Sequence, residues 1–126
     1  MGKIRVAVIG LGYVGLPLAR LFATLYPVVG FDVKRERVAA LMAGQDATQE
    51  VSGELLQSVL LPHLPGEGEN GLFCTSDVED LRSCNYYIVA VPTPVDLHHS
   101  PDLTPLYSAS ETVGKVLGEG DIVIYE

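Results

Sequence analysis

Three glycines at close spacing follow an apolar run in the segment VIGLGYVGLP, residues 8–17. Gly10, Gly12 and Gly15 form the pattern G-x-G-x-x-G, placed where a predicted strand ends and a predicted helix begins. In that position the first glycine permits a tight turn, the second lets the backbone approach a pyrophosphate, and the third lets the helix pack closely. Because the N-terminus of a helix attracts negative charge, the pattern predicts a dinucleotide site.

An acidic residue at the end of the next predicted strand supports this interpretation. Asp32 ends the segment VGFD, where a carboxylate can accept hydrogen bonds from the ribose hydroxyls of adenosine. The same charge repels a 2′-phosphate and so favours NAD over NADP. Lys34, Arg35 and Arg37 follow closely and keep NADP open as an alternative, and FAD is the other dinucleotide option. The alternative without function is a glycine-rich turn beside a solvated aspartate.

Two cysteines and two adjacent histidines are the other residues that could react or bind a metal. Cys74 falls in a predicted strand and Cys84 in a helix-to-strand turn, so we expect both to be small core residues rather than nucleophiles. His98 and His99 could act as metal ligands or as a general base, because imidazole titrates near neutrality. Histidines in a polar loop are more often solvated, and we predict no metal site.

A scaffold for these residues is visible in the alternation of apolar runs of strand length with segments of helical period. Ser76 and Glu79 form a capping box, and Thr104 with Pro105 is typical of an N-cap followed by the first helical residue. Predicted strands cover residues 3–10, 28–33, 72–75, 86–91 and 121–125. Predicted helices cover residues 13–25, 35–43, 50–61, 76–83 and 104–118, with loops at 65–71 and 92–103.

This order of elements predicts an α/β fold. We expect a Rossmann-like, doubly wound parallel sheet of order 3-2-1-4-5 that forms a single domain over residues 1–126. The length fits one ordinary domain. No apolar run approaches the roughly 18 residues of a membrane span, so we expect no membrane partner.

Charge and cysteine content restrict the partners and the compartment. Eight basic and 16 acidic residues give a net charge of −8, which is the wrong sign for tracking a phosphate backbone and excludes nucleic acid as an expected partner. Only two cysteines are present, without histidine at metal-binding spacing. This composition suits a reducing compartment, so we expect a cytoplasmic protein.

Five segments carry a family resemblance: KIRVAVIGLGYVGLPLA, FDVKRERV, VAVPTPVD, PDLTPL and GDIVIYE. Together they resemble the N-terminal cofactor domain of the nucleotide-sugar 6-dehydrogenases, the UDP-glucose/GDP-mannose dehydrogenase family. The resemblance covers essentially the whole chain. In the loop PTPVDLHHSPDLTPL the chain is more similar to the branch that acts on UDP-N-acetylhexosamines than to the UDP-glucose branch.

The resemblance implies a set of NAD contacts. It places Asp32 on the ribose and Arg37 beside the adenosine, although from the residues alone Arg37 could equally lie over the adenine or be an ordinary surface arginine. After the fourth predicted strand, the segment VPTP would close over the cofactor. The implied cofactor-binding residues are Gly10, Leu11, Gly12, Tyr13, Val14, Gly15, Asp32, Arg37, Val91, Pro92 and Thr93.

The activity that the resemblance implies is the oxidation of a UDP-sugar C6 alcohol to a uronic acid in two NAD-dependent steps, the second through a cysteine thioester. Neither cysteine lies in the glycine-rich setting of that nucleophile, so we expect no catalytic residue in residues 1–126. We expect Glu126 to be a point of truncation, with the sugar-binding domain downstream, and the whole enzyme to be a homo-oligomer. The alternative function is a non-catalytic Rossmann module that senses a nucleotide or redox state.

Overall fold

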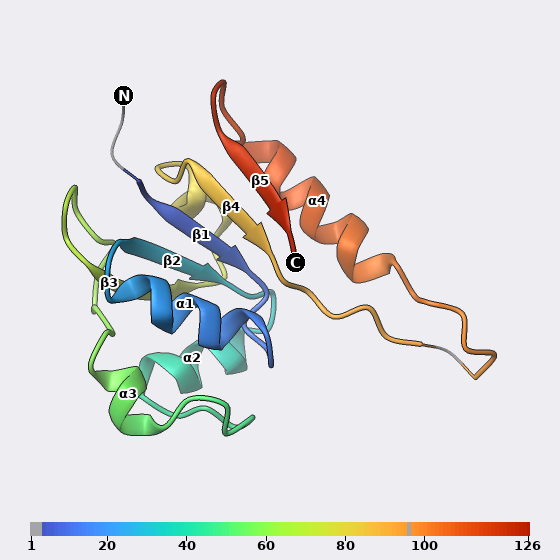
Figure 1. Ribbon diagram of the computed structural model, residues 1–126, viewed down its shortest axis with the longest axis horizontal. Helices are drawn as coiled ribbons and strands as arrows, with labels where there is room; N and C mark the ends of the chain where they lie inside the picture. The colour runs from blue at the N-terminus through green and yellow to red at the C-terminus, as the bar shows by residue number, and fades with distance from the viewer. Residues whose placement is uncertain (1–3, 96) are drawn as a thin grey trace.

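The computed structural model describes residues 4–95 and 97–126, so Lys3 of the predicted strand 3–10 and Asp96 of the predicted loop 92–103 lie outside the described residues. Five parallel strands form one sheet in the order β3-β2-β1-β4-β5 (Figure 1). This order confirms the prediction. The strands are β1 (Val6–Ile9), β2 (Pro27–Phe31), β3 (Gly71–Thr75), β4 (Tyr86–Val89) and β5 (Ile122–Tyr125).

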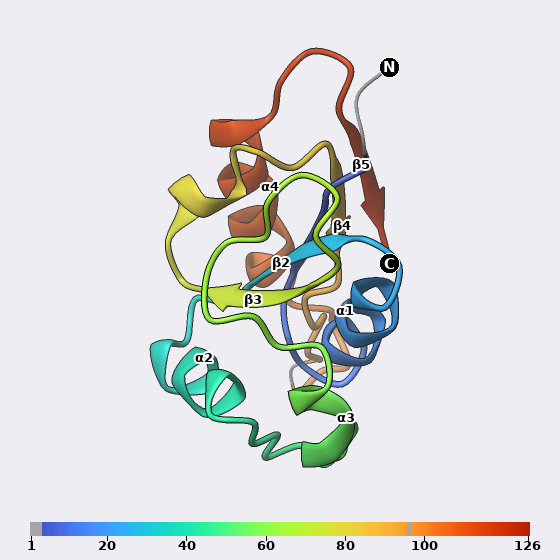
Figure 2. The ribbon, with the colours of Figure 1, turned by 90° about the vertical axis from the view of Figure 1, so that its left-hand side faces the viewer.

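Helical segments cover both faces of this sheet. Helix α1 and helix α4 lie on opposite sides of it (Figure 2). Among the described residues, no helix combines the length and the apolar character needed to cross a membrane. The helical segments are α1 (Gly15–Ala23), α2 (Arg35–Met42), α3 (Gly53–Gln57), the 3-10 helix η1 (Val78–Leu81) and α4 (Thr104–Val116).

The central strand β1 shows why its sequence is apolar without interruption. Successive side chains of a strand point to opposite faces. Val6 and Val8 pack into the core on the α1 side, whereas Ala7 and Ile9 pack into the core beneath α4 and η1. Because both faces are covered, all four residues are buried and no position can be polar.

The carboxyl ends of β1, β2 and β4 meet at one edge of the sheet. Ile9 is in register with Phe31 of β2 and with Val89 of β4. The chain leaving β1 stays tied to both neighbours, because Gly10 N donates to Phe31 O and Ala90 N donates to Ile9 O, each at 2.8 Å. The loops after these three strands are therefore held side by side, which is where ligands bind in open parallel sheets.

Two predicted helix starts are wrong. The predicted helix 76–83 is the short η1, and its N-cap is Asp77, whose Oδ1 accepts from Glu79 N at 3.0 Å. Ser76 forms no capping box, because its hydroxyl instead donates to the carbonyl of Asp32 at 2.7 Å. Thr104 is the first residue of α4 rather than its N-cap.

The other boundaries differ more modestly. The predicted helix 50–61 contains only the short α3, which Ser52 caps by accepting from Leu55 N at 3.2 Å. Before α4, Asp102 Oδ1 accepts from Thr104 N at 2.9 Å, so a side chain outside the helix satisfies the first amide. In both places a short polar side chain decides where the helix begins.

Candidate functional site

The three glycines of the first turn meet different surroundings. Gly10 has a φ of +97°, and a Cβ there would lie 2.9 Å from Ala90 O. A Cβ on Gly15 would collide with the carbonyl of Gly10. A Cβ on Gly12, in contrast, would have no protein atom within 4 Å. The fold itself therefore requires Gly10 and Gly15, while Gly12 leaves open space at the surface of the turn.

Backbone amides at the start of α1 belong to the same turn as that open space. The first hydrogen bond of α1 runs from Leu16 N to Gly12 O at 3.2 Å, and no side chain caps the helix at Val14. The amides of residues 12–15 precede this bond and are the donors that a helix N-terminus offers to an anion. The side chains of Tyr13 and Val14 are 69% and 52% exposed, so they line the approach to the turn from solvent.

Asp32 lies beside the glycine turn at the carboxyl end of β2. Its Oδ2 accepts from Leu11 N at 3.0 Å and its Oδ1 accepts from Lys34 N at 3.0 Å. An ionised carboxylate has about four lone-pair positions, so two backbone amides leave acceptor capacity for the hydroxyls of a ribose. The structure thus brings together two parts of the predicted site, the turn and the acid.

Arg37 is not a surface arginine. Its side chain is 13% exposed. The guanidinium donates from Nε and Nη2 to the carbonyl of Leu11, at 2.9 and 2.6 Å, and from Nη1 to Asp46 Oδ1 at 2.8 Å. Of the two interpretations of Arg37 from the residues alone, the surface one is wrong, since the side chain reaches from α2 to the glycine turn.

Asp46 is a residue of this region that the sequence reasoning missed. Its side chain is fully buried, and its carboxylate accepts from Arg37, from both N and Oγ1 of Thr48, and from the amides of Glu50 and Val51. Burial disfavours the charged carboxylate, but the hydrogen bonds from Thr48, Val51 and Arg37 outweigh it and lower the pKa of Asp46 to about 2. The pair of Asp46 and Thr48 at turn spacing was the signal available in the sequence.

The segment after β4 lies on the other side of the glycine turn. Val91 packs against the core beneath α4, whereas Pro92 and Thr93 are exposed. Beyond them the chain leads away from the sheet before it returns to α4 (Figure 1). Val91 is next to the turn, because a Cβ on Gly10 would lie 3.1 Å from its Cα. Contact of Val91, Pro92 and Thr93 with a cofactor remains a prediction.

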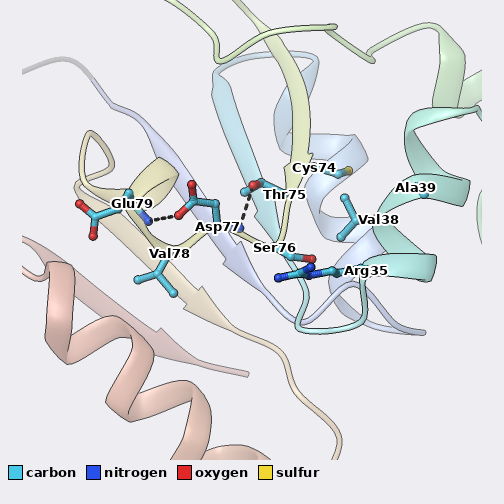
Figure 3. Close-up of a pocket in the computed structure, with 9 residues that line it drawn as sticks. All are labelled: Arg35, Val38, Ala39, Cys74, Thr75, Ser76, Asp77, Val78 and Glu79. Atoms are coloured by element: carbon cyan, nitrogen blue, oxygen red, sulfur yellow. Dashed lines mark hydrogen bonds between the residues drawn. The ribbon is translucent and has the colours of Figure 1, made fainter.

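A hollow of about 730 Å³ opens between α2 and the segment after β3 (Figure 3). Its wall is apolar at Val38 and Ala39 and polar at Ser76 and Asp77. It adjoins the predicted ribose position, because the Ser76 hydroxyl donates to the carbonyl of Asp32. Arg35 is the one basic residue among the described residues that line it.

The cysteines have the character predicted for them. Cys74 and Cys84 are free and buried, with 2% and 3% of their surface exposed. Burial raises the pKa of each thiol to about 12. At neutral pH both are therefore protonated and packed in the core, which does not suit a nucleophile.

His, Cys, Asp and Glu are the side chains that could hold a metal ion. Within residues 4–95 and 97–126, no three or more His, Cys, Asp or Glu side chains are grouped so that they could hold an ion. His98 and His99 lie in the exposed segment between β4 and α4.

Comparison with known proteins adds to this geometry. Residues 4–126 match the model of the UDP-glucose/GDP-mannose dehydrogenase family, NAD binding domain. A UDP-N-acetyl-D-glucosamine 6-dehydrogenase of Pseudomonas aeruginosa is 50% identical over 126 residues, which are 100% of this chain and 28% of that enzyme. One of Salmonella typhi is 47% identical over 124 residues, which are 98% of this chain and 27% of that enzyme.

A solved structure shows the same arrangement of elements. The UDP-D-ManNAc dehydrogenase of Pyrococcus horikoshii superposes with a TM-score of 0.80 at 37% identity, over 98% of this chain and 28% of that one. The chain therefore spans little more than a quarter of the length of the relatives it matches.

Proposed function

The chain belongs to the UDP-glucose/GDP-mannose dehydrogenase family as its NAD-binding domain, and from this premise we propose that it is the cofactor-binding part of an NAD-dependent nucleotide-sugar 6-dehydrogenase. The proposed reaction oxidises the C6 alcohol of a UDP-sugar to the uronic acid. When bound, NAD would act as the hydride acceptor. The task of this chain's residues is to bind that cofactor and fix its orientation.

The observation that carries the proposal is the open space at Gly12. Nothing in the fold prevents a side chain there, since an added Cβ would meet no protein atom within 4 Å. A glycine at this position is explained if a pyrophosphate approaches the backbone, with the amides of residues 12–15 as its donors. The residues present therefore fit a dinucleotide.

The proposed choice of NAD over NADP rests on Asp32 and Arg37. The carboxylate of Asp32 stands at the proposed ribose position and would repel a 2′-phosphate. Arg37, one of the three basic residues that kept NADP open, has its guanidinium turned toward Leu11 O and Asp46 Oδ1. The guanidinium of Arg37 is thus already paired within the protein. The other two basic residues, Lys34 and Arg35, are exposed.

The proposed substrate class is the UDP-N-acetylhexosamines. Support comes from the two relatives named UDP-N-acetyl-D-glucosamine 6-dehydrogenase, at 50% and 47% identity. We assign no catalytic residue to the described chain and place the thioester cysteine and the sugar site in a further part of the protein. In support, those relatives are more than three times as long as the matched segment. The sensing-module alternative is not favoured, because the relatives are named as dehydrogenases.

Several finer features belong to the same proposal. A cytoplasmic enzyme fits two free, buried thiols. A net charge of −8 argues against nucleic acid as a partner. The exposed apolar residues Ile122, Ile124 and Tyr125 of β5 fit a homo-oligomer.

The test of the proposed activity is NADH formation, followed by absorbance, with the natural protein that contains this chain. UDP-N-acetylhexosamines should support turnover with NAD, and UDP-glucose should do so less well. The 126-residue chain alone should give none with any UDP-sugar, since no alcohol is positioned beside the cofactor. Absence of NAD reduction by the natural protein with every UDP-sugar would contradict the proposal.

A further inference from the structure

The peptide groups of Leu11 are held from both sides. Its N–H donates to Asp32 Oδ2 at 3.0 Å, and its C=O accepts two N–H groups of Arg37 at 2.9 and 2.6 Å. The Leu11 side chain is also fully buried in the α1-side core. Leu11 is therefore the fixed point of a turn whose next residues face solvent.

Fixing the carbonyl of Leu11 also fixes the N–H of Gly12. These two groups belong to one planar peptide unit, and in a trans peptide they point in opposite directions. The described residues contain no cis peptide bond. Because Arg37 holds the carbonyl on the α2 side, the N–H of Gly12 points away from α2. Glycine offers little resistance to a rotation of this peptide unit, so the orientation depends on the contact with Arg37.

Arg37 is in turn oriented by Asp46. The guanidinium bridges the Leu11 carbonyl and Asp46 Oδ1, and the ion pair is shielded from solvent at both ends, with 13% and 0% of the side chains exposed. Asp46 is itself anchored, because its Oδ2 accepts from the amide of Val51, whose side chain is buried in the α1-side core. A continuous series of contacts thus runs from the core through Asp46 and Arg37 to the turn.

We propose that Asp46 is a positioning residue for the cofactor: it holds Arg37 on the carbonyl of Leu11 and so keeps the N–H of Gly12 aimed at the pyrophosphate. This inference rests on the proposed function, since it assumes that the turn binds NAD. It differs from a purely structural role for Asp46, because the effect on NAD passes through Arg37 alone.

A double-mutant cycle on NAD affinity tests that difference. The dissociation constant for NAD is measured by calorimetry for wild type, Asp46→Asn, Arg37→Gln and the double variant. Each single change should raise the dissociation constant for NAD about tenfold, as expected for loss of a charge-assisted hydrogen bond. The double variant should be no weaker than Arg37→Gln alone. An unchanged affinity in Asp46→Asn, or losses that multiply in the double variant, would overturn the proposal.

Two further variants serve as a control and as an independent test. Asp121→Asn is the matched control. Asp121 Oδ2 also accepts from a backbone amide, that of Gly118, but it lies in the turn before β5, at the amino end of the strand. The NAD affinity of this variant should equal that of wild type. Arg37→Lys leaves every backbone bond to Asp46 in place but removes the two-donor contact with Leu11 O. It should also weaken NAD about tenfold, and wild-type affinity there would overturn the proposal even if Asp46→Asn failed to fold.

The outcome for wild type separates this inference from the proposed function. If wild type binds NAD and the variants bind equally well, the inference fails and the proposed function stands. If wild type does not bind NAD, both fail.

Discussion

Asp32 has one observed role and one proposed role. It holds the glycine turn through Leu11 N, and in the proposed site its remaining acceptor positions bind a ribose. Asp32→Ala should therefore weaken NAD by about 1–3 kcal/mol, the range for hydrogen bonds to a charged group. NADP should lose less, because the repulsion of its 2′-phosphate is removed by the same change. Calorimetric titration with both cofactors checks this prediction. Equal losses of binding free energy for NAD and NADP would place Asp32 outside the ribose site.

The two buried thiols lead to a second prediction for single residues. Cys74→Ser and Cys84→Ser should each lower the free energy of unfolding by about 1–3 kcal/mol, because a hydroxyl is buried in an apolar core. NAD affinity should not change. With the pKa raised by burial to about 12, both wild-type thiols should react slowly with a thiol reagent at pH 7. Rapid labelling of either cysteine that NAD suppresses would show that this residue belongs to the site.

Part of the candidate site could be predicted from the sequence, for physical reasons that differ between residues. The glycines and Asp32 were predictable because their spacing follows from the geometry of a strand, a turn and a helix. The contact of Arg37 with Leu11 O and its pairing with Asp46 were not, because they depend on how α2 and the segment 46–51 fold back on the turn. The close packing of Gly30 against Leu11 was also not predicted. A Cβ on Gly30 would lie 2.9 Å from the Leu11 side chain.

In the turn between β1 and α1, we propose that Gly12 is needed for NAD binding, whereas the fold itself requires Gly15. Gly12→Ala should leave the melting temperature near that of wild type while weakening NAD, because its Cβ occupies only the proposed pyrophosphate position. Gly15→Ala is the matched comparison and should destabilise the fold, because its Cβ collides with Gly10 O. Thermal melts and NAD titrations of both variants decide the matter. Full NAD affinity in a folded Gly12→Ala would contradict the proposed site.

The segment 46–51 should make stability sensitive to acid. The pKa of Asp46 is lowered in the fold from its ordinary 3.8 to about 2, so its contribution is fully present above the unfolded pKa and is lost as the pH falls toward 2. The shift corresponds to about 2 kcal/mol. Urea unfolding of wild type and Asp46→Asn should show a stability difference that shrinks between about pH 5 and pH 2. A difference independent of pH would contradict this assignment.

The elements themselves were predictable in type and order but not in their ends. Continuous apolar runs predicted strands covered on both faces. Their alternation with helices predicted a doubly wound sheet, for which 3-2-1-4-5 is the usual order. The predicted start of η1 was wrong because two neighbouring polar residues could cap it. Asp77 accepts from the amide of Glu79, whereas the Ser76 hydroxyl donates to the carbonyl of Asp32. That choice depends on how close β2 lies, which local sequence does not contain.

For the molecule as a whole, β5 is an apolar edge. Among the described residues it pairs only with β4 (Figure 1), and its Ile122, Ile124 and Tyr125 are 45%, 43% and 55% exposed. Such an edge promotes association with a second chain. The 126-residue chain should therefore self-associate with rising concentration, and Ile124→Lys should reduce this. Val123 is less suitable for the test, because it packs against the core beneath α4.

Light scattering across a concentration series measures this association. Leu97→Lys is the control, since Leu97 is 97% exposed on the segment that leads away from the sheet. It adds the same charge and should associate as wild type does. A wild type that stays monomeric throughout, or association lost in Leu97→Lys and kept in Ile124→Lys, would show that β5 is not the contact.

Titration of the wild-type chain with NAD and with NADP in a calorimeter tests whether the glycine turn and Asp32 form an NAD site. One NAD should bind per chain, and NADP should bind more weakly because its 2′-phosphate meets the charge of Asp32. Tighter binding of NADP than of NAD would contradict the proposed role of Asp32, and no heat of binding with NAD from a folded chain would contradict the proposed NAD site.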